Sequence, residues 1–290
     1  MTLRGILPVL ATPFDPSGEI VEQDVRRLVN AMIEVGVHGL AAVGEASESS
    51  KMTRDERCRL AEIVFDEARG RVPIIVGVSA PNARESAILA EHAGALGAAA
   101  VFLLPPTSAS YPDTFAAMRR VADAGSAPVM LQDLYYPMTV ETIARLVREE
   151  PRIAYVKEEI LLPGIATLKM SQIHAATAGK LAMLGGRGGQ ALISELRRGA
   201  VASMPACLGA SGLVKAYNAY AAGAFDQADR EFSRVAPILL WRAQYGQLIV
   251  KAYLKEIGVF SHAAVREPSE AAPDAIDIGE VMKAVAFAEA

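Results

Sequence analysis

Lys157 has the clearest chemical potential in this chain, because it closes the apolar run IAYVK, which has the composition of a buried strand. Strand alternation places Tyr155, Lys157 and Glu159 on the same side of that run. Apolar neighbours desolvate an amine and favour its neutral form, which can attack a ketone to give an imine. The run is therefore consistent with a lysine that forms a Schiff base with a ketone. Taken alone, it is equally consistent with an exposed lysine at a strand end.

A turn with several hydrogen-bonding groups, residues 44–48, follows the second apolar run. Gly44 permits a sharp bend, and Ser47 offers its hydroxyl and a backbone N–H where a helix is about to begin, with Ala46 beside it as a further candidate for substrate binding. Such groups suit a substrate carboxylate. The alternative role for Ser47 is helix capping. Capping is also the expected role of Thr53, which forms a capping box with Glu56.

Two further strand ends carry candidate substrate contacts. Gln132 and Asp133 close the fifth apolar run, where Gln132 is expected to hydrogen-bond a substrate hydroxyl and Asp133 either contacts substrate or caps the next loop. The glycine-rich loop that begins at Gly185 follows the seventh run. Glycines let a backbone approach a ligand closely, although an ordinary flexible turn would have the same composition.

The elements that must position these residues are eight short apolar runs that alternate with amphipathic stretches. Continuous apolar strands joined by helices are typical of a parallel sheet buried on both faces. No glycine-rich dinucleotide loop follows the first run, which favours a closed (β/α)8 barrel, the TIM-barrel class of α/β folds, over an open doubly wound sheet. The runs span residues 6–10, 39–43, 73–78, 100–104, 128–132, 153–157, 181–184 and 201–204.

The remainder of the chain has only helical patterns, at residues 211–222, 225–257 and 276–287. We therefore predict a barrel over residues 1–206 and a C-terminal helical extension over residues 207–290, packed on the barrel. Such an extension either covers one end of the barrel or forms an oligomer surface, and the pattern favours neither.

Composition excludes several other classes of protein. The chain has 290 residues, a formal net charge of -4 and no run of Lys or Arg, which argues against a nucleic-acid partner. No apolar run reaches membrane-spanning length and the start does not resemble a signal peptide, so we expect a cytoplasmic protein without a membrane partner. The 2 cysteines and 4 histidines lack metal-ligand spacing, and no metal site is expected.

Short motifs in matching order give the chain a resemblance to the dihydrodipicolinate synthase / N-acetylneuraminate lyase family of class I lyases. The resemblance implies a homotetramer of barrels in which a lysine imine forms on pyruvate or a similar 2-oxo acid, with no metal or organic cofactor. The motifs extend over nearly the whole chain. They are Thr12-Pro13-Phe14, Gly36-Val37-His38-Gly39-Leu40, Gly44 with Glu48, Asp55-Glu56, Leu104-Pro105-Pro106, the strand ending at Lys157, and Gly199-Ala200.

Departures from the family pattern remove its phenolic proton relay. The family turn Gly-Thr-Thr-Gly-Glu is replaced by the residues 44–48, and the strand-five tyrosine is replaced by Gln132, which cannot act as an acid or base near neutral pH. A tyrosine pair is replaced by Pro106-Thr107, and residues 136–139 lack the arginine that holds the second substrate of the synthase. Neither dihydrodipicolinate synthesis nor the usual sialic acid cleavage is therefore expected. A phenol supplied by Tyr111, Tyr135 or Tyr136 from another direction would weaken the preference for a dehydratase.

One branch of the family, the 2-keto-3-deoxyarabonate dehydratases, resembles the chain more closely. The shared marks are Ser47-Glu48, Leu131-Gln132-Asp133, Lys157-Glu158-Glu159, the glycine-rich loop from Gly185 and Met204 on the last strand. This resemblance implies dehydration of a 2-keto-3-deoxy sugar acid in carbohydrate catabolism, with Met204 and Gly185 at the substrate.

The hypothesis from sequence is therefore a Schiff-base lyase in which Lys157 forms the imine and a carboxylate moves protons. Glu159 is the first candidate for that carboxylate by strand parity, and Glu48 is the second. Two alternatives stay open: retro-aldol cleavage of the same acids to pyruvate and an aldehyde, and a non-catalytic barrel that binds a 2-oxo acid.

Overall fold

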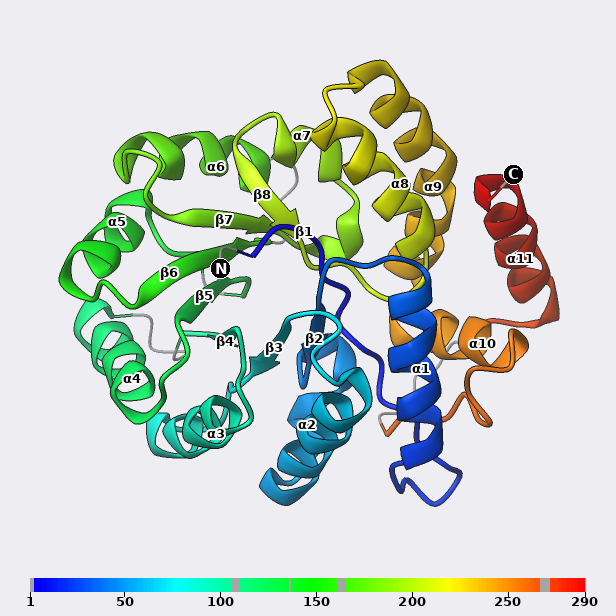
Figure 1. The fold of residues 1–290 in the computed structure, drawn as a ribbon, viewed down its shortest axis with the longest axis horizontal. Coiled ribbons are helices and arrows are strands. Elements are labelled where there is room, and N and C mark those ends of the chain that lie inside the picture. The colour runs from blue at the N-terminus through cyan, green and yellow to red at the C-terminus, as the bar shows by residue number, and fades with distance from the viewer. Residues whose placement is uncertain (1–2, 106–109, 136, 161–164, 267–271, 290) are drawn as a thin grey trace.

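Eight parallel strands form one sheet at the centre of the computed structural model, which describes residues 3–105, 110–135, 137–160, 165–266 and 272–289 (Figure 1). Val9 makes parallel bridges to both Ala41 and Ala206, which joins the two ends of the sheet and closes the barrel. The predicted TIM barrel and all eight of its strands are confirmed. The strands are β1 (Gly5–Ile6), β2 (Leu40–Ala42), β3 (Ile74–Gly77), β4 (Ala100–Leu103), β5 (Val129–Asp133), β6 (Ile153–Glu158), β7 (Ala182–Gly185) and β8 (Ala200–Ser203).

Helices surround the sheet and cover its outer face (Figure 1). The helix after β2 begins as predicted, because the Thr53 side chain accepts a hydrogen bond from the Glu56 backbone and Glu56 returns one in a capping box. The barrel helices are α1 (Glu22–Glu34), α2 (Arg54–Ala68), α3 (Ala83–Ala95), α4 (Tyr111–Ala124), α5 (Val140–Glu149), α6 (Ile165–Ala176), α7 (Leu192–Leu196) and α8 (Ala210–Ala221). Within the described residues, the 3-10 helices η1 (Glu45–Ser47) and η2 (Ser49–Lys51) follow β2 in succession, and η3 (Arg187–Gly189) follows β7.

Two apolar regions stabilise the barrel, one inside it and one between the sheet and the helices. The interior contains Leu7, Phe102, Met130, Tyr155 and Met204, all buried. Successive strand residues point alternately inward and outward, so each strand contributes to both regions and reads as continuously apolar. Burial of these side chains supplies the main stabilising free energy, at about 25 cal/mol per Å² of apolar surface.

The C-terminal extension contains α9 (Phe225–Tyr245), α10 (Gln247–Glu256) and α11 (Ala275–Glu289). The single helix predicted over residues 225–257 is divided at Gly246, whose positive φ of 58° ends α9. Helix α8 packs on β1 and completes the eighth β/α unit, so the division expected at residue 206 falls between the strand and the helix of that unit. Helix α9 packs against α8 and η3, which brings it to the carboxyl end of β7. None of the helices in the described ranges is long and apolar enough to cross a membrane.

Candidate active site

Lys157 and Glu159 lie together at the carboxyl end of β6. The Lys157 Nζ atom is 2.6 Å from Glu159 Oε1, and both side chains are more than nine-tenths buried. The intervening Glu158 faces the opposite side of the strand, as the period of two requires. The structure thus brings together the imine lysine and the first candidate carboxylate of the sequence hypothesis.

Two neighbouring strands hold the Glu159 carboxylate in place. Gln132 Nε2 donates to Glu159 Oε1 at 2.6 Å, and the Arg187 backbone N–H donates to Oε2 at 3.1 Å. A Cβ atom on Gly186 would lie only 2.2 Å from Glu159 Oε2, so the loop needs glycine there to admit the carboxylate. With Lys157, three donors orient Glu159, which therefore has a defined position beside the amine.

A cavity of about 220 Å³ opens above Lys157 and Glu159 at the carboxyl ends of the strands. This end of a (β/α)8 barrel is where such enzymes bind their substrates. Two of the sequence candidates for substrate binding, Ala46 and Met204, line the cavity. The other lining residues are Val9, Gly44, Glu45, Phe102, Leu134, Tyr135, Arg187, Gly188, Pro205, Ala206 and Arg242.

Ser47, Gln132 and Gly185 are placed differently from the sequence expectation. The Ser47 hydroxyl is fully buried, donates to the Leu10 carbonyl at 2.6 Å and accepts from the Gly44 N–H at 3.1 Å. It therefore holds the turn that lines the cavity, without lining the cavity itself. Gln132 contacts Glu159, and Gly185 packs its α-carbon against the Glu195 carboxylate on the outer side of the barrel.

Glu48 is drawn away from the cavity by the C-terminal extension. Its carboxylate forms an ion pair with the fully buried Lys251 and accepts a hydrogen bond of 2.9 Å from the Arg266 backbone. Lys251 also donates to the Ala264 carbonyl at 2.8 Å. Glu48 therefore links the turn after β2 to the extension, and Glu159 is the carboxylate that faces Lys157.

Asp133 also faces outward, because it alternates with the inward-facing Gln132 on β5. Lys169 of α6 forms ion pairs with both Asp133 and Glu158, the latter at 3.1 Å. Burial, assisted by the negative charge of Asp133, raises the pKa of Glu158 to about 8. This buried group therefore secures α6 to the outer face of the sheet, behind the candidate active site.

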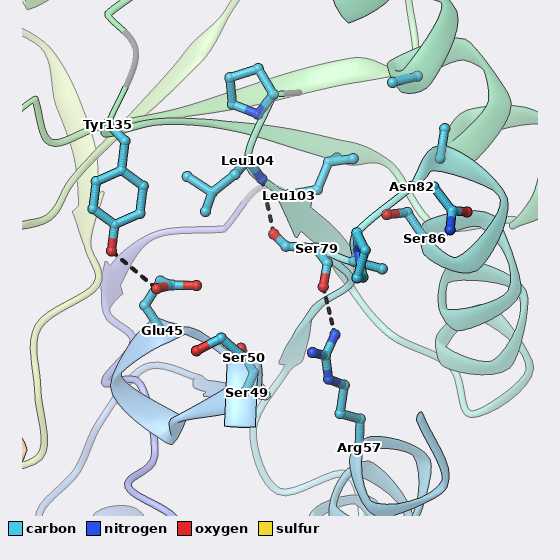
Figure 2. A pocket seen from close by; sticks show the side chains of 15 residues that line it. Glu45, Ser49, Ser50, Arg57, Ser79, Asn82, Ser86, Leu103, Leu104 and Tyr135 are labelled. Carbon is cyan, nitrogen blue, oxygen red and sulfur yellow. Dashed lines mark hydrogen bonds between the residues drawn. The ribbon is translucent and has the colours of Figure 1, made fainter. Parts of the chain in front are cut away.

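Glu45 is a cavity residue to which the sequence hypothesis gave no role, and Tyr135 is one of the three tyrosines that it named as a possible source of a phenol. The Tyr135 hydroxyl donates to Glu45 Oε2 at 3.1 Å, as Figure 2 shows. Burial and the negative charge of Glu45 raise the pKa of Tyr135 to about 12, so this phenol stays protonated at neutral pH. Tyr111 instead lies on α4 under the Arg145 guanidinium, and Tyr136, Pro106 and Thr107 lie outside the described residues.

A second pocket, of about 370 Å³, borders the same Tyr135–Glu45 pair (Figure 2). Its polar lining includes Arg57, whose guanidinium donates to the Ser79 carbonyl at 2.6 Å, and Ser79, whose hydroxyl accepts from the Leu104 N–H at 3.0 Å. Because Tyr135 and Glu45 line both spaces, their side chains form part of the boundary between the pocket and the Lys157 cavity.

Glu195 on α7 is a buried carboxyl behind the cavity, only 1% exposed. Its Oε2 atom has no hydrogen-bond partner among the described residues. Burial, with the negative charge of Glu159, raises the pKa of Glu195 to about 8, although Arg187 and Lys157 oppose this effect. The folded protein therefore binds a proton at Glu195 more tightly than the unfolded chain does.

Replacement of Glu195 should change how stability depends on pH. Between the unfolded pKa of about 4.3 and the folded pKa of about 8, the native state retains a proton that the unfolded state releases, so unfolding free energy falls as pH rises. Glu195→Gln removes this loss, and it should be more stable than wild type by a few kcal/mol (on the order of 1.4 per pH unit) at pH 8.

Urea unfolding of both proteins from pH 5 to pH 8, at one protein concentration, measures this difference. The stability gain of Glu195→Gln should grow with pH, from about 1 kcal/mol at pH 5 to several kcal/mol at pH 8. A gain that is the same at every pH would contradict the raised pKa of Glu195, because an uncharged packing effect does not titrate.

Comparisons with known proteins place this site in a family. The sequence matches the dihydrodipicolinate synthetase family over residues 2–281. L-2-keto-3-deoxyarabonate dehydratase of Azospirillum brasilense is 31% identical over 274 residues, which are 91% of this chain and 88% of that protein. The 4-hydroxy-tetrahydrodipicolinate synthase of Salinibacter ruber is 35% identical over 164 residues, which span 54% of each.

A solved structure supports the same relationship. The dihydrodipicolinate synthase of Rhodopseudomonas palustris superposes with a TM-score of 0.88 at 26% identity, covering 98% of this chain and 97% of that one. The family model covers nearly the whole chain, and the relationship inferred from short motifs is thereby confirmed. The chain belongs to the dihydrodipicolinate synthetase family of Schiff-base lyases.

Proposed function

We propose that the protein dehydrates a 2-keto-3-deoxy sugar acid through an imine on Lys157. The observation that carries this proposal is the buried Lys157–Glu159 pair, in which Gln132 orients the carboxylate from a strand end where the family pattern has a tyrosine. A carboxylate thus stands where a proton must be moved, next to the amine. The name of the Azospirillum brasilense relative, a 2-keto-3-deoxyarabonate dehydratase, supports the same reaction class.

The reaction begins when the Lys157 amine attacks the C2 carbonyl of the substrate and water leaves, which gives a protonated imine. The positive imine nitrogen makes the C3 protons acidic, because it accepts the electron pair that is released when one of them leaves. Glu159 takes that proton, and a neutral enamine forms. Lys157 therefore provides the electron sink and Glu159 the base.

Loss of the C4 hydroxyl completes the elimination. The enamine electrons move back toward C4, the C4–O bond breaks, and Glu159 returns its proton to the departing oxygen, so that water leaves and the carboxylate is regenerated. With a pentonate, loss of a C5 proton and return of a proton to C3 then shift the double bond to C4–C5, and the resulting enol becomes the C5 aldehyde when C4 takes up the enol proton. Water finally hydrolyses the imine, which frees Lys157 and the dehydrated 2-oxo acid. One carboxylate serves both proton transfers, so no tyrosine is needed.

We assign the substrate carboxylate to the turn Gly44–Glu45–Ala46, whose backbone lines the cavity opposite β6. Ser47 acts on this turn through its hydrogen bonds to Leu10 and Gly44. Met204 supplies an apolar wall near the imine carbon. We also propose that the protein is a homotetramer, as the family resemblance implies, and light scattering of the purified protein tests this assembly. We place the enzyme in the cytoplasm and in carbohydrate catabolism.

Product analysis tests the proposed reaction. Purified protein incubated with the 2-keto-3-deoxypentonates should yield the semialdehyde of 2-oxoglutarate, detected by mass spectrometry, together with one water per turnover. Formation of pyruvate and glycolaldehyde instead would establish the aldolase. Retention of an imine with no product from the pentonates, the hexonates or the corresponding 2-keto-3-deoxy diacids would identify a non-catalytic 2-oxo-acid-binding barrel.

The aldolase is the second candidate because Tyr135 places a protonated phenol at the edge of the cavity, hydrogen-bonded to Glu45. Retro-aldol cleavage needs a base at the C4 hydroxyl, and a phenol–carboxylate pair can relay that proton. Both reactions share the Lys157 imine. Dehydration breaks the C4–O bond, whereas retro-aldol cleavage breaks the C3–C4 bond.

A further inference from the structure

Arg242 reaches the catalytic cavity from α9, outside the barrel strands. It lines the cavity together with Lys157 and Glu159, although it lies 85 positions further along the chain than Lys157. Its Nε atom is buried and has no hydrogen-bond partner within the described ranges. Burial lowers the pKa of Arg242, which the negative charge of Glu159 only partly offsets. A partly buried guanidinium without a hydrogen-bonded carboxylate among the described residues therefore faces the space that the substrate would occupy.

The loop after β7 makes room for this side chain. Gly188 has a positive φ of 69°, and a Cβ atom there would lie 3.2 Å from the Arg242 Cδ atom. Arg242 thus enters the cavity beside the end of β7. The turn that carries Ala46 follows β2, which is separated from β7 by β1 and β8 around the barrel. The guanidinium and the Ala46 turn consequently border different sides of the cavity.

Arg242 differs from the buried lysines in lacking an anionic partner. Lys157, Lys169 and Lys251 each form an ion pair with a carboxylate. No carboxylate of the described part of the chain forms an ion pair with Arg242, and the oxygens of Glu159 are already bound by Lys157, Gln132 and Arg187. Arg242 is partly buried and its charge has no anionic partner in that part of the chain, so an anion that entered the cavity would be stabilised there.

We propose that Arg242 binds a second carboxylate, at the end of the substrate farthest from the imine. The substrate class is then a 2-keto-3-deoxy acid with carboxylates at both ends, derived from an aldaric acid. A guanidinium matches a carboxylate with two parallel hydrogen bonds, which gives stronger and more selective binding than a hydroxyl receives. This inference rests on the proposed function, because it assumes that the C2 carbonyl of the substrate is held as an imine on Lys157.

Imine trapping tests the assignment without requiring turnover. The probes are 2-oxoglutarate, 2-oxopentanoate, which has the same five carbons but no second carboxylate, and pyruvate. Each is mixed with the full-length protein, reduced with borohydride in a fixed short pulse, and quantified by intact mass. Wild type should reach half-maximal trapping at a concentration of 2-oxoglutarate at least tenfold lower than that of 2-oxopentanoate.

Variants of Arg242 identify the source of that preference. Arg242→Gln should raise the half-maximal concentration of 2-oxoglutarate at least tenfold and change those of pyruvate and 2-oxopentanoate less than twofold. Arg242→Lys should recover part of the preference, since it keeps the charge but not the paired hydrogen bonds. Unchanged thermal unfolding and unchanged pyruvate trapping show that each variant is folded.

The remaining outcomes separate failure of this inference from failure of the proposed function. Trapping of all three acids without a preference for 2-oxoglutarate overturns the role of Arg242 and leaves the Lys157 imine intact. A preference lost in Arg187→Gln but kept in Arg242→Gln transfers the role to the neighbouring arginine. Weaker pyruvate trapping in Arg242→Gln would mean that Arg242 holds the carboxylate next to the imine. If no acid is trapped by wild type, the Schiff-base function itself fails, and the inference with it.

Discussion

Lys157→Ala should form no borohydride-stable adduct with any 2-oxo acid and should lose at least about ten-thousandfold in turnover. The reason is that the amine is the only group in the proposed reaction that makes a covalent bond to substrate and provides the electron sink. Lys157 is only 5% exposed and lies 2.6 Å from Glu159. An amine from the solvent therefore cannot readily reach this position and take its place.

Intact mass and peptide mapping check this expectation. Trypsin cannot cleave after a reduced, alkylated lysine, so trapped wild-type protein should yield residues 153–169 as one modified peptide, uncut at Lys157. Lys157→Met serves as a second variant, because it removes the amine while keeping most of the apolar volume. An adduct that persists in both variants, or that maps to Lys169 or Lys251, would place the imine elsewhere.

Glu159→Gln should retain imine formation and lose about a hundredfold to ten-thousandfold in kcat for dehydration. Glutamine keeps the shape of the side chain and its ability to hydrogen-bond, but it can neither accept the C3 proton nor return it to the departing hydroxyl. The loss should therefore appear after imine formation. Borohydride trapping should capture the adduct of the intact substrate, whose mass exceeds that of the dehydrated adduct by one water.

Glu158→Gln is the matched control for this prediction, since it alters the adjacent carboxyl on the opposite face of β6. Its turnover should stay within a few-fold of wild type, because Glu158 pairs with Lys169 behind the sheet. Glu48→Gln addresses the second candidate carboxylate and should chiefly lower stability by leaving Lys251 unpaired. If Glu48→Gln and not Glu159→Gln abolishes dehydration, the proton shuttle is Glu48.

The pairing of Lys157 with Glu159 was predictable because it depends only on the period of two along one strand. The eight strands were predictable for a similar reason, since a strand buried on both faces reads as an apolar run wherever it occurs. Gln132 was recognised as a residue of the site. The contact of Gln132 with Glu159 was not predicted, because it depends on the register between β5 and β6, in which Gln132 lies opposite Lys157.

Residues of distant helices that contact the site, or the turn beside it, could not be inferred in this way. Arg242 and Lys251 belong to helices whose sequence pattern is compatible with either a lid or an oligomer surface, so their contacts depend on how α9 and α10 dock on the barrel. Ser47 illustrates a different difficulty. A hydroxyl at a turn has the same sequence signature whether it binds a ligand or, as here, the backbone of another segment.

The contribution of α9 to the cavity wall has a consequence for how this scaffold can diversify. The reactive amine and its carboxylate lie only two positions apart, at the end of β6 and directly after it, whereas Arg242 belongs to a helix that takes no part in the sheet. Substitutions on the cavity side of α9 can therefore alter which acids are accepted while the imine chemistry is inherited unchanged. A library confined to α9 and the loop around Gly188 would explore new substrates at little risk to the reaction itself.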